Sequence, residues 1–443
     1  MKKFVCLLLT LFLTVPLTAC HQHVPGLEAT CTTDQVCLDC GKVLVAALGH
    51  EEGAAASCTA PQVCLRCGEV LAEMLPHTPS GPVSCTVSQT CTVCGTLLVQ
   101  ANGHSVDANG VCAVCGKQVC EAGQRYIAPG RGDYTDADAD GIVPETTNAG
   151  HYTNDLDAYY ANSVLICGDY GVEYFTPDPT GSTGYASIVN DFAAKYPALN
   201  VTALIVPKCC AFETPAGYTD AGERIKSFIN STYEKMDSRV KTADAFGAME
   251  PHAGEYLFYR TDHHWTSLGA YYASAAYCEA NGIEPHALGD YDTVVRGNVT
   301  GTLYMYAGHD GNLQRNPDYT VCHFPTTGYT MQCYRGGWYN AVAVNGGYKD
   351  YASVFINGDN PLTVINTDNE NGKTLLVFKE SYGNAFVPYM IDYYQRVVVV
   401  DIREETESVA TLIDRYGVTD VLFINNAQAA VGFQDIIRNK AMS

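Results

Sequence analysis

The sequence predicts an α/β protein: one large domain built on a mainly parallel sheet, preceded by a tandem array of small cysteine-rich modules. Two observations support this prediction. After about residue 150, continuous apolar runs alternate with helix-like stretches, the pattern of parallel strands covered by helices on both faces. Before residue 120, cysteine and histidine recur at a fixed period, which indicates repeated modules.

The large domain is predicted over residues 151–443, a length sufficient for an extensive hydrophobic core. We expect a three-layer α/β/α arrangement, because apolar strands and amphipathic helices alternate along it. The expected strands are 164–167, 201–206, 374–378, 397–401 and 421–425, and the expected helices are 188–196, 221–236, 384–394 and 404–416. The Gly- and Tyr-rich residues 296–372 interrupt this alternation, and we expect an irregular, partly β insertion that helps to wall a site.

Residues 1–20 have the features of a lipoprotein signal peptide. Lys2 and Lys3 precede an apolar run that is too short to span a bilayer comfortably. The run ends in Leu17-Thr18-Ala19-Cys20, which resembles the lipobox of bacterial lipoproteins and implies cleavage before Cys20 and lipid on its sulfur. We therefore expect an exported protein anchored by lipid to the outer face of the bacterial cell membrane, with an ordinary secretory signal as the alternative.

Residues 21–120 contain four repeats of a Cys/His motif. Three have the pattern H-x7-C-x5-C-x2-C-G with a period of 27 residues, and the fourth is shorter. The candidate metal ligands, repeat by repeat, are His23, Cys31, Cys37 and Cys40; His50, Cys58, Cys64 and Cys67; His77, Cys85, Cys91 and Cys94; and His104, Cys112, Cys115 and Cys120.

Three sulfurs and one imidazole per repeat match the ligand set of tetrahedral structural zinc. A repeat this short buries little core, so metal would supply its folding energy. Disulfides are the alternative in an exported protein, but they would leave one cysteine unpaired in each repeat and would not explain the histidine. We expect about four structural zinc ions, one per repeat. The array would also offer a surface for a protein partner, whose identity the sequence leaves open.

Residues 121–150 are predicted to be an acidic linker. They combine the turn-rich Pro129-Gly130-Arg131-Gly132 with the acidic run 133–140 and contain few core residues. Asp136, Asp138 and Asp140 match the start of a calcium loop, but the twelfth position is Thr147 instead of Glu. Calcium binding is therefore the minor alternative.

The charge balance excludes some classes of partner. The chain has 26 Lys and Arg against 48 Asp and Glu, a formal net charge of −22. Such a charge argues against nucleic-acid binding and against peripheral binding to anionic lipid, because both depend on basic surfaces.

The first cluster of candidate catalytic side chains is Asp262-His263-His264. It follows a short aromatic run, 255–259, and precedes a predicted helix cap at Thr266, so we expect a strand-to-helix turn. Such turns are where open α/β sheets place ligands. An Asp two residues before a His can orient the imidazole as a general base. In the alternatives, Asp262 caps a helix and the histidines pack, or the three residues bind a metal.

The second cluster follows two later strands. Ser381 comes after strand 374–378, and backbone N–H groups around Gly383 could stabilise an oxyanion. The alternative role for Ser381 is that of a simple helix N-cap. Arg403 follows strand 397–401, where it would bind substrate or an oxyanion, or form a surface salt bridge.

The segments Y-R-T-D-H-H-W-T-S-L-G-A-Y-Y, K-E-S-Y-G-N-A-F-V-P and V-V-D-I-R resemble the DHHW family of bacterial exported proteins. That family resembles a branch of the SGNH hydrolases related to periplasmic alginate O-acetylation proteins. The resemblance implies an SGNH-hydrolase-like fold for residues 151–443, with Ser381 as nucleophile, His264 as base and Asp262 as the residue that orients it. The chain has Glu380 where the usual relative has Asp before the serine, which leaves the oxyanion geometry open.

The candidate site residues and the family resemblance are compatible with two classes of function. The first is a serine-dependent ester hydrolase or O-acyltransferase, most simply for acetyl, that acts on cell-envelope or extracellular glycans and needs no cofactor in the catalytic domain. The second is a non-catalytic surface protein that binds glycan or serves as a scaffold and carries a degenerate SGNH-like domain.

Overall fold

The computed structural model describes residues 22–130, 139–144, 158–212, 220–404 and 406–443. The predicted signal peptide with Cys20, and most of the acidic run 133–140 with Thr147, lie outside the described residues. The chain divides into two compact units. One extends to Ser80 and includes Cys91–Thr96, and the other holds Gly81–Thr90 and Leu97–Ser443. The fourth repeat therefore belongs to the same unit as the large domain, although we expected a boundary at residue 120.

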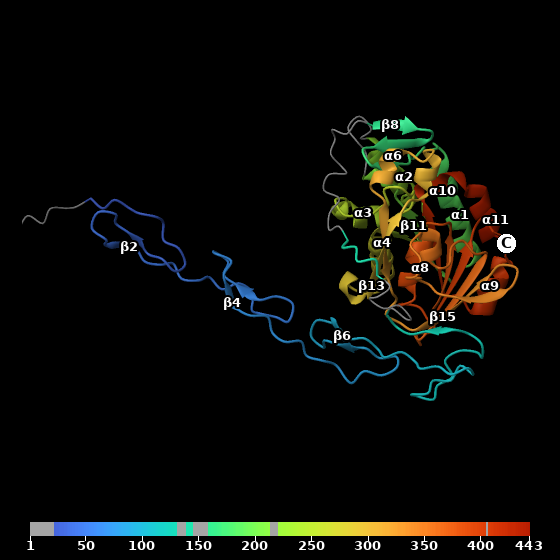
Figure 1. Cartoon of the computed structure of the whole chain (residues 1–443), viewed down its shortest axis with the longest axis horizontal. Coiled ribbons are helices and arrows are strands. Elements are labelled where there is room, and N and C mark those ends of the chain that lie inside the picture. The colour runs from blue at the N-terminus through green and yellow to red at the C-terminus, as the bar shows by residue number, and fades with distance from the viewer. Residues whose placement is uncertain (1–21, 131–138, 145–157, 213–219, 405) are drawn as a thin grey trace, which may run out of the picture. The chain divides into compact units, whose positions relative to one another are not determined.

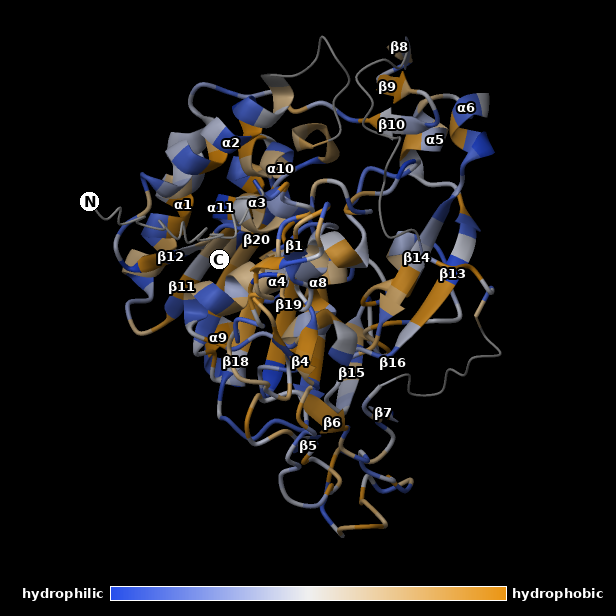
Figure 2. Cartoon of the chain, turned by 90° about the vertical axis from the view of Figure 1, so that its left-hand side faces the viewer, coloured by the Kyte–Doolittle hydropathy of each residue, from blue (hydrophilic) through white to orange (hydrophobic). Residues whose placement is uncertain are grey.

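A nine-stranded sheet organises the second unit (Figure 1). Its strands, in spatial order, are β12 (Val240–Ala243), β11 (Asn200–Val206), β20 (Asp420–Asn426), β18 (Thr374–Lys379), β19 (Arg396–Asp401), β17 (Leu362–Thr367), β15 (Tyr329–Tyr334) and β16 (Trp338–Ala341), with β7 (Tyr126–Ile127) also paired to β15. The apolar strands β11, β18, β19 and β20 form its buried centre (Figure 2).

The sheet is only partly parallel, which corrects the prediction of a mainly parallel sheet. The five strands β12, β11, β20, β18 and β19 run parallel to one another. The strands β17, β15, β16 and β7 continue the sheet in antiparallel pairing. The expected insertion at 296–372 therefore contributes β15, β16 and β17 to the central sheet, while its other elements lie outside that sheet. Strands β15 and β16 form a hairpin with a short turn, a connection that antiparallel pairing allows.

Helices cover both faces of the parallel half, so the predicted three layers are present there. The helices of the unit are α1 (Gly181–Lys195), α2 (Asp220–Tyr233), α3 (Ala245–Met249), α4 (Ser267–Asn281), α5 (Thr302–Tyr306), α6 (Gly311–Arg315), α7 (Tyr351–Val354), α8 (Gly383–Met390), α9 (Val409–Tyr416), α10 (Ala427–Gly432) and α11 (Gln434–Ala441). Helices α1 and α10 lie on one side of β11, and α3 and α4 lie on the other (Figure 1).

The remaining described elements of this unit are small. They comprise three short helical turns, η2 (Cys209–Ala211), η3 (Glu250–His252) and η4 (Leu288–Asp290), the hairpin β13 (Thr293–Val299) with β14 (Asp318–His323), and the three-stranded sheet of β8 (Ala158–Ala161), β9 (Val164–Cys167) and β10 (Tyr170–Val172). The expected strand 164–167 is thus correct as a strand but lies outside the central sheet. The aromatic run 255–259 forms no strand and makes only a single bridge, between Phe258 and Trp265.

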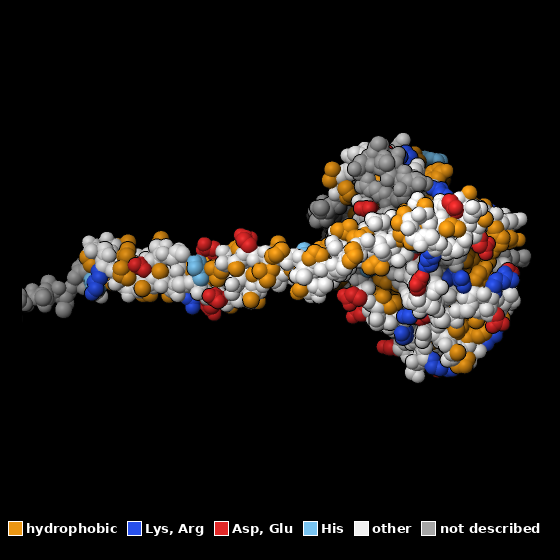
Figure 3. Space-filling model, turned by 90° about the horizontal axis from the view of Figure 1, so that it is seen from below, with side chains coloured by type: hydrophobic (Ala, Val, Ile, Leu, Met, Phe, Trp, Pro, Cys, Tyr) orange, Lys and Arg blue, Asp and Glu red, His pale blue; other side chains and the backbone are white. Residues whose placement is uncertain are grey.

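The first three repeats each contain one two-stranded hairpin. These are β1 (Gln35–Val36) with β2 (Val43–Val45), β3 (Gln62–Val63) with β4 (Val70–Ala72), and β5 (Gln89–Thr90) with β6 (Leu97–Val99). Among the described residues of the first unit, the fully buried ones are all cysteines: Cys31, Cys37, Cys58, Cys64 and Cys91. Large apolar side chains such as Leu27, Leu38 and Leu65 are exposed instead (Figure 3). These repeats have no hydrophobic core of their own.

Candidate active site and metal groups

A continuous hydrogen-bond chain joins Ser381, His264 and Asp262. Ser381 Oγ lies 2.8 Å from His264 Nε2, and His264 Nδ1 lies 2.6 Å from Asp262 Oδ1. Ser381 occupies the turn between β18 and α8, while Asp262 and His264 lie in the loop before α4. Asp262 and His264 are buried and Ser381 is partly accessible. The structure therefore brings together three residues that are up to 119 positions apart in the sequence, as a nucleophile, a base and an orienting carboxylate would require.

Thr302 holds Asp262 through the carboxylate oxygen that does not face His264. The Thr302 N–H and hydroxyl donate to Asp262 Oδ2 over 2.8 and 3.1 Å. The backbone can approach this closely because residue 301 is glycine, where a Cβ would lie only 2.3 Å from the Cβ of Asp262. Burial alone would raise the pKa of Asp262, but the facing His264 and these hydrogen bonds hold it well below its usual range. The carboxylate stays ionised and can stabilise a protonated imidazole.

The imidazole of His264 is held between two rings. Tyr351 stacks on one face, with ring centroids 3.9 Å apart and planes within 8°. His263 lies 3.9 Å away, tilted by 35°. The Nδ1 atom of His263 is paired with the Thr302 hydroxyl, and burial lowers the pKa of His263 to about 4. His263 is therefore neutral at neutral pH and packs beside the site.

Trp265 connects the two halves of the site. Its side chain is completely buried, and its indole N–H donates to the carbonyl of Tyr382 over 2.9 Å. Tyr382 in turn donates from its hydroxyl to the carbonyl of His263. The next residue, Thr266, caps α4 as predicted, because its side chain accepts from the N–H of Gly269. The tryptophan of the motif thus holds the histidine loop against the serine turn.

The serine turn is organised by Glu380. Its carboxylate accepts the N–H of Tyr382 at 3.1 Å and that of Asn426 at 2.9 Å, which joins the turn to the end of β20. The N–H of Gly383 donates to the carbonyl of Glu380. This corrects the prediction that Gly383 supplies an oxyanion donor, because the helical turn already uses its N–H. The N–H of Ser381 itself has no acceptor among the described residues.

Arg403 lies in a cluster of salt bridges and stays partly exposed. Its guanidinium lies 2.7 Å from carboxylate oxygens of both Asp401 and Asp359. The same two carboxylates bind the fully buried Lys379, at 2.8 and 2.9 Å. Burial alone would lower the pKa of Arg403, but the two acids raise it above its ordinary range. The salt bridges of the alternative are therefore present, and a substrate or oxyanion role for Arg403 stays a prediction.

The metal alternative at the histidine cluster does not fit the hydrogen bonding. The candidate ligand atoms of Asp262, His263 and His264 lie within 4.8 Å of one another. However, both nitrogens of His264 are taken by Asp262 and Ser381, and Nδ1 of His263 is taken by Thr302. A metal would have to break this chain, so these contacts favour proton transfer over coordination.

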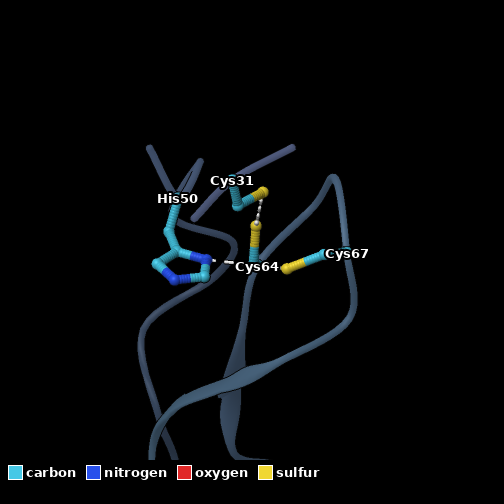
Figure 4. A group of neighbouring side chains, drawn as sticks. All are labelled: Cys31, His50, Cys64 and Cys67. Carbon is cyan, nitrogen blue, oxygen red and sulfur yellow. Dashed lines mark hydrogen bonds between the residues drawn. The ribbon is translucent and has the colours of Figure 1, made fainter. Parts of the chain in front are cut away.

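In the repeats, three complete Cys3His groups come together, and each takes one ligand from the preceding repeat. Figure 4 shows one of them, in which Cys31 lies beside His50, Cys64 and Cys67. Each group is numbered by the repeat that supplies its histidine. The second group is Cys31, His50, Cys64 and Cys67; the third is Cys58, His77, Cys91 and Cys94; and the fourth is Cys85, His104, Cys112 and Cys115. The first group holds three ligands, His23, Cys37 and Cys40. This corrects the predicted grouping within single repeats.

Cys120, which we expected to complete the last group, lies outside all four. The contiguous motif misled the grouping because the first cysteine of each repeat faces the following C-x2-C turn. Each complete group therefore joins two consecutive repeats.

The spacing of these ligands tests their fit to zinc. Tetrahedral zinc, with bonds of about 2.3 Å to sulfur and 2.0 Å to nitrogen, requires about 3.8 Å between two sulfurs and about 3.6 Å between sulfur and nitrogen. The Sγ atoms of Cys31 and Cys64 are 3.7 Å apart, and Cys67 Sγ lies 3.5 Å from His50 Nδ1. The sulfurs are much too far apart for a disulfide. Burial acts to raise the pKa of Cys64, but backbone N–H groups of Cys67 and Arg66 lower it to about 5, which favours the thiolate that a metal needs.

Sequence reasoning missed Thr302 and Tyr351, which contact Asp262 and His264. Both lie in the segment 296–372 that we expected to wall the site, but nothing in the local sequence distinguishes them from its other threonines and tyrosines.

The fold and site together define an α/β protein with a Ser–His–Asp hydrogen-bond chain at the carboxyl end of β18, a strand in the middle of its central sheet. The family model described as DHHW protein matches residues 135–400, so the chain belongs to the DHHW family. This confirms the resemblance found in the sequence, and the match begins inside the expected linker. No curated protein matches the chain.

Several solved structures are similar to this chain, among them a DHHW family protein and PatB1. The crystal structure of a DHHW family protein from Eubacterium siraeum is 32% identical, covers 65% of this chain and 99% of its own, and has a TM-score of 0.61. Bacillus cereus PatB1 with a sulfonyl adduct is 18% identical, covers 64% of this chain and 98% of its own, and has a TM-score of 0.52, a likeness of fold. Among the residues that the structure describes, no helix is long and apolar enough to cross a membrane.

Proposed function

We propose that this protein is a serine-dependent ester enzyme, an acyl hydrolase or O-acyltransferase, with Ser381 as nucleophile. The observation that carries the proposal is the chain of short contacts from Ser381 Oγ through the His264 ring to Asp262. A helix N-cap serine, the alternative, needs no histidine. Here the imidazole is held by the stacked Tyr351 and by Asp262, so its Nε2 remains directed at the serine.

In the proposed reaction, His264 Nε2 takes the proton of Ser381 as Oγ attacks the acyl carbon of the ester. The carbon–oxygen bond of the ester then breaks, and the leaving alcohol takes that proton from His264. An acyl-serine remains. Water or a second hydroxyl attacks its acyl carbon as His264 takes the proton of the attacking group, and the bond from that carbon to Ser381 Oγ then breaks as His264 returns the proton to Oγ. The N–H of Ser381, which has no acceptor among the described residues, is a donor available to the developing oxyanion. Asp262 stabilises the charged imidazole throughout.

The acyl group and acceptor are assigned by resemblance. The similarity to alginate O-acetylation proteins favours acetyl and a cell-envelope or extracellular glycan. The leader that ends in Cys20 supports export and lipid anchoring at the outer face of the cell membrane. Hydrolase and transferase share the acyl-serine step and differ only in whether water or a sugar hydroxyl resolves it.

We also propose that the repeats bind structural zinc. The three complete groups present three thiols and one imidazole at the separations of a tetrahedral site, and cysteines are the buried residues of the first unit. Zinc bound there would hold consecutive repeats together. A protein partner of the repeats remains a proposal of the same kind, supported by their exposed apolar side chains.

Labelling with phenylmethylsulfonyl fluoride tests the enzyme proposal. We expect one sulfonyl group per chain, located at Ser381 by peptide mass spectrometry, and strongly reduced labelling of the His264→Ala variant. Ser408 is a matched control, because its hydroxyl also caps a helix, accepting the N–H of Thr411, but faces no histidine in the described structure. Labelling of Ser408 at the same rate as Ser381, or no labelling of either, would show a domain without an activated serine and favour the glycan-binding alternative.

A further inference from the structure

We infer that Asp368, a residue of the α/β domain, is the outer-sphere carboxylate of the fourth metal group, so that metal in this group stabilises the catalytic domain itself. The inference rests on the proposed zinc binding and assigns a new positioning residue to it. Its consequence is that the last repeat is a metal-dependent part of the catalytic domain.

The evidence begins with His104. Its Nδ1 faces the metal group, 3.4 Å from Cys115 Sγ, so its proton must reside on Nε2 when Nδ1 binds metal. That Nε2 is buried and has no hydrogen-bond partner in the part of the chain that the structure describes. The nearest carboxylate oxygen is Oδ1 of Asp368, at 3.7 Å. Metal-bound histidines almost always donate their second N–H to such an acceptor, and a small ring movement would close this bond.

Asp368 is itself held in place. The hydroxyl of Tyr126 donates to Asp368 Oδ2 over 2.6 Å, and the same hydroxyl accepts the backbone N–H of His104 over 3.1 Å. The Tyr126 ring also packs edge-on against the His104 imidazole. Both side chains of the His104–Asp368 pair are more than nine-tenths buried. The carboxylate is therefore aimed at the histidine by a third residue, which an incidental surface contact would not require.

The second and fourth groups differ in the carboxylate that faces the outer nitrogen of the histidine. In the second group, His50 Nε2 lies 3.5 Å from Glu69, which follows the C-x2-C-G turn of the same repeat and is largely exposed. The equivalent residue in the fourth repeat is Lys117, which cannot accept a hydrogen bond and pairs with Glu370 instead. The acceptor that the second group has in its own repeat is thus supplied to the fourth group by the α/β domain.

Further contacts tie this repeat to the central sheet. Strand β7, just after the last repeat, pairs with β15, and Gln124 donates to Gln332 on that strand over 3.0 Å. Gln100 donates to the carbonyl of Thr326 over 3.2 Å. The repeat folds only with metal in this proposal, and the residues that flank it contact β15. We therefore expect metal loss to weaken the sheet at β15.

The test measures zinc release and domain stability in the full, zinc-loaded chain. Zinc transfer to the chromogenic chelator 4-(2-pyridylazo)resorcinol is followed for the parent, Asp368→Asn and the matched control Glu69→Gln. Asparagine keeps an oxygen for Tyr126 but removes the charge. We expect Asp368→Asn to speed the release of one zinc by about ten- to a hundredfold and Glu69→Gln to have a much smaller effect, because Glu69 is exposed.

Domain stability is read from tryptophan fluorescence, since both tryptophans, Trp265 and Trp338, lie in the α/β domain. We expect Cys115→Ser, which removes a ligand of the fourth group, to lower its thermal midpoint by several degrees. The matched Cys67→Ser, in the second group, should leave that midpoint unchanged. The inference is overturned if Asp368→Asn leaves all zinc release rates unchanged, or if Cys115→Ser and Cys67→Ser lower the midpoint equally. Absence of zinc from the parent chain would instead refute the zinc proposal on which it rests.

Discussion

The repeats and the α/β domain are stabilised by opposite means. In the first unit the buried residues that the structure describes are cysteines, and large apolar side chains such as Leu38 and Leu65 are exposed. In the α/β domain, strands β11 and β18 bury nearly every side chain between helices. The comparison shows that one chain combines metal-dependent modules, whose folding energy comes from a few ligands, with a domain whose folding energy comes from a large apolar core.

Removal of metal by a chelator should give the largest difference between the two regions: the repeats should unfold and the α/β domain should stay folded. Structural zinc contributes about 10–16 kcal/mol per site in small modules, more than the stability of a hairpin with no core. We expect excess chelator under reducing conditions to abolish amide protection in hairpins β1–β2 and β3–β4 while the fluorescence of buried Trp265 persists. Hydrogen exchange measures the first and emission wavelength the second. Hairpins that stay protected without metal would show that the repeats fold by other means.

Native mass spectrometry of the reduced chain should count at least three zinc ions, one per complete group. Intact disulfides and no metal in native protein would show that disulfides, and not metal, stabilise the repeats.

Removing the Asp262 charge should affect chemistry without affecting either region's fold. In Asp262→Asn the side chain still accepts from Thr302, but it no longer stabilises a protonated His264. We expect turnover of 4-nitrophenyl acetate to fall about ten-thousand-fold, as in a known triad, with an unchanged thermal midpoint. His263→Ala is the matched control and should lose far less, because its Nδ1 is paired with Thr302. Loss of activity in His263→Ala with full activity in His264→Ala would reverse the assignment of the base.

Acid should weaken the domain through His323, which lies far in sequence from every metal ligand. Burial lowers the pKa of His323 to about 4, and its Nδ1 lies 2.6 Å from the hydroxyl of Tyr389, with Tyr291 nearby. The unfolded chain takes up this proton near pH 6.5 and the folded chain only near pH 4. The free energy of unfolding must therefore fall as pH drops between these values, by about 2 kcal/mol from pH 7 to pH 5.

The variant His323→Gln should remove about that much of the pH dependence, as measured by urea denaturation followed by tryptophan fluorescence. An unchanged dependence would mean that His323 is charged in the folded domain. Zinc release followed in the same acid titration gives the response of the repeats, whose ligands must be deprotonated to hold metal.

The smallest expected effect concerns Tyr351. Its hydroxyl lies 2.9 and 3.0 Å from the carbonyls of Ser381 and Tyr382, while its ring supports His264. Tyr351→Phe keeps the ring, and we expect kcat to fall about tenfold, the equivalent of one hydrogen bond, with KM unchanged. Tyr277→Phe is the control, because it removes a buried hydrogen bond to Tyr394. An equal fall in kcat in both variants would show that Tyr351 acts on the stability of the domain and not on the position of the serine turn.

The expected elements of the parallel half were close to those observed. Apolar runs at 201–206, 374–378, 397–401 and 421–425 correspond to β11, β18, β19 and β20, because strands buried on both faces have continuous apolar sequences. The antiparallel strands β15 and β17 were missed. They mix polar and apolar residues and lie among glycines and tyrosines, so they lack the continuous apolar run of the parallel strands. Their pairing with β19 and with each other identifies them.

The sequence by itself determined the chemistry of this protein: the family, the Asp262, His264 and Ser381 side chains, and the Cys/His repeats with their period of 27 residues. These are local patterns, in which residue type and spacing carry the information. Only the tertiary structure decided which cysteine joins which histidine, and that Gly383 and Arg403 have partners of their own. It also decided that Tyr351 stacks on His264 and that Thr302 holds Asp262. Those outcomes depend on contacts between segments distant in sequence, and such contacts leave no local pattern because many side chains of the same type would serve equally well before the chain folds.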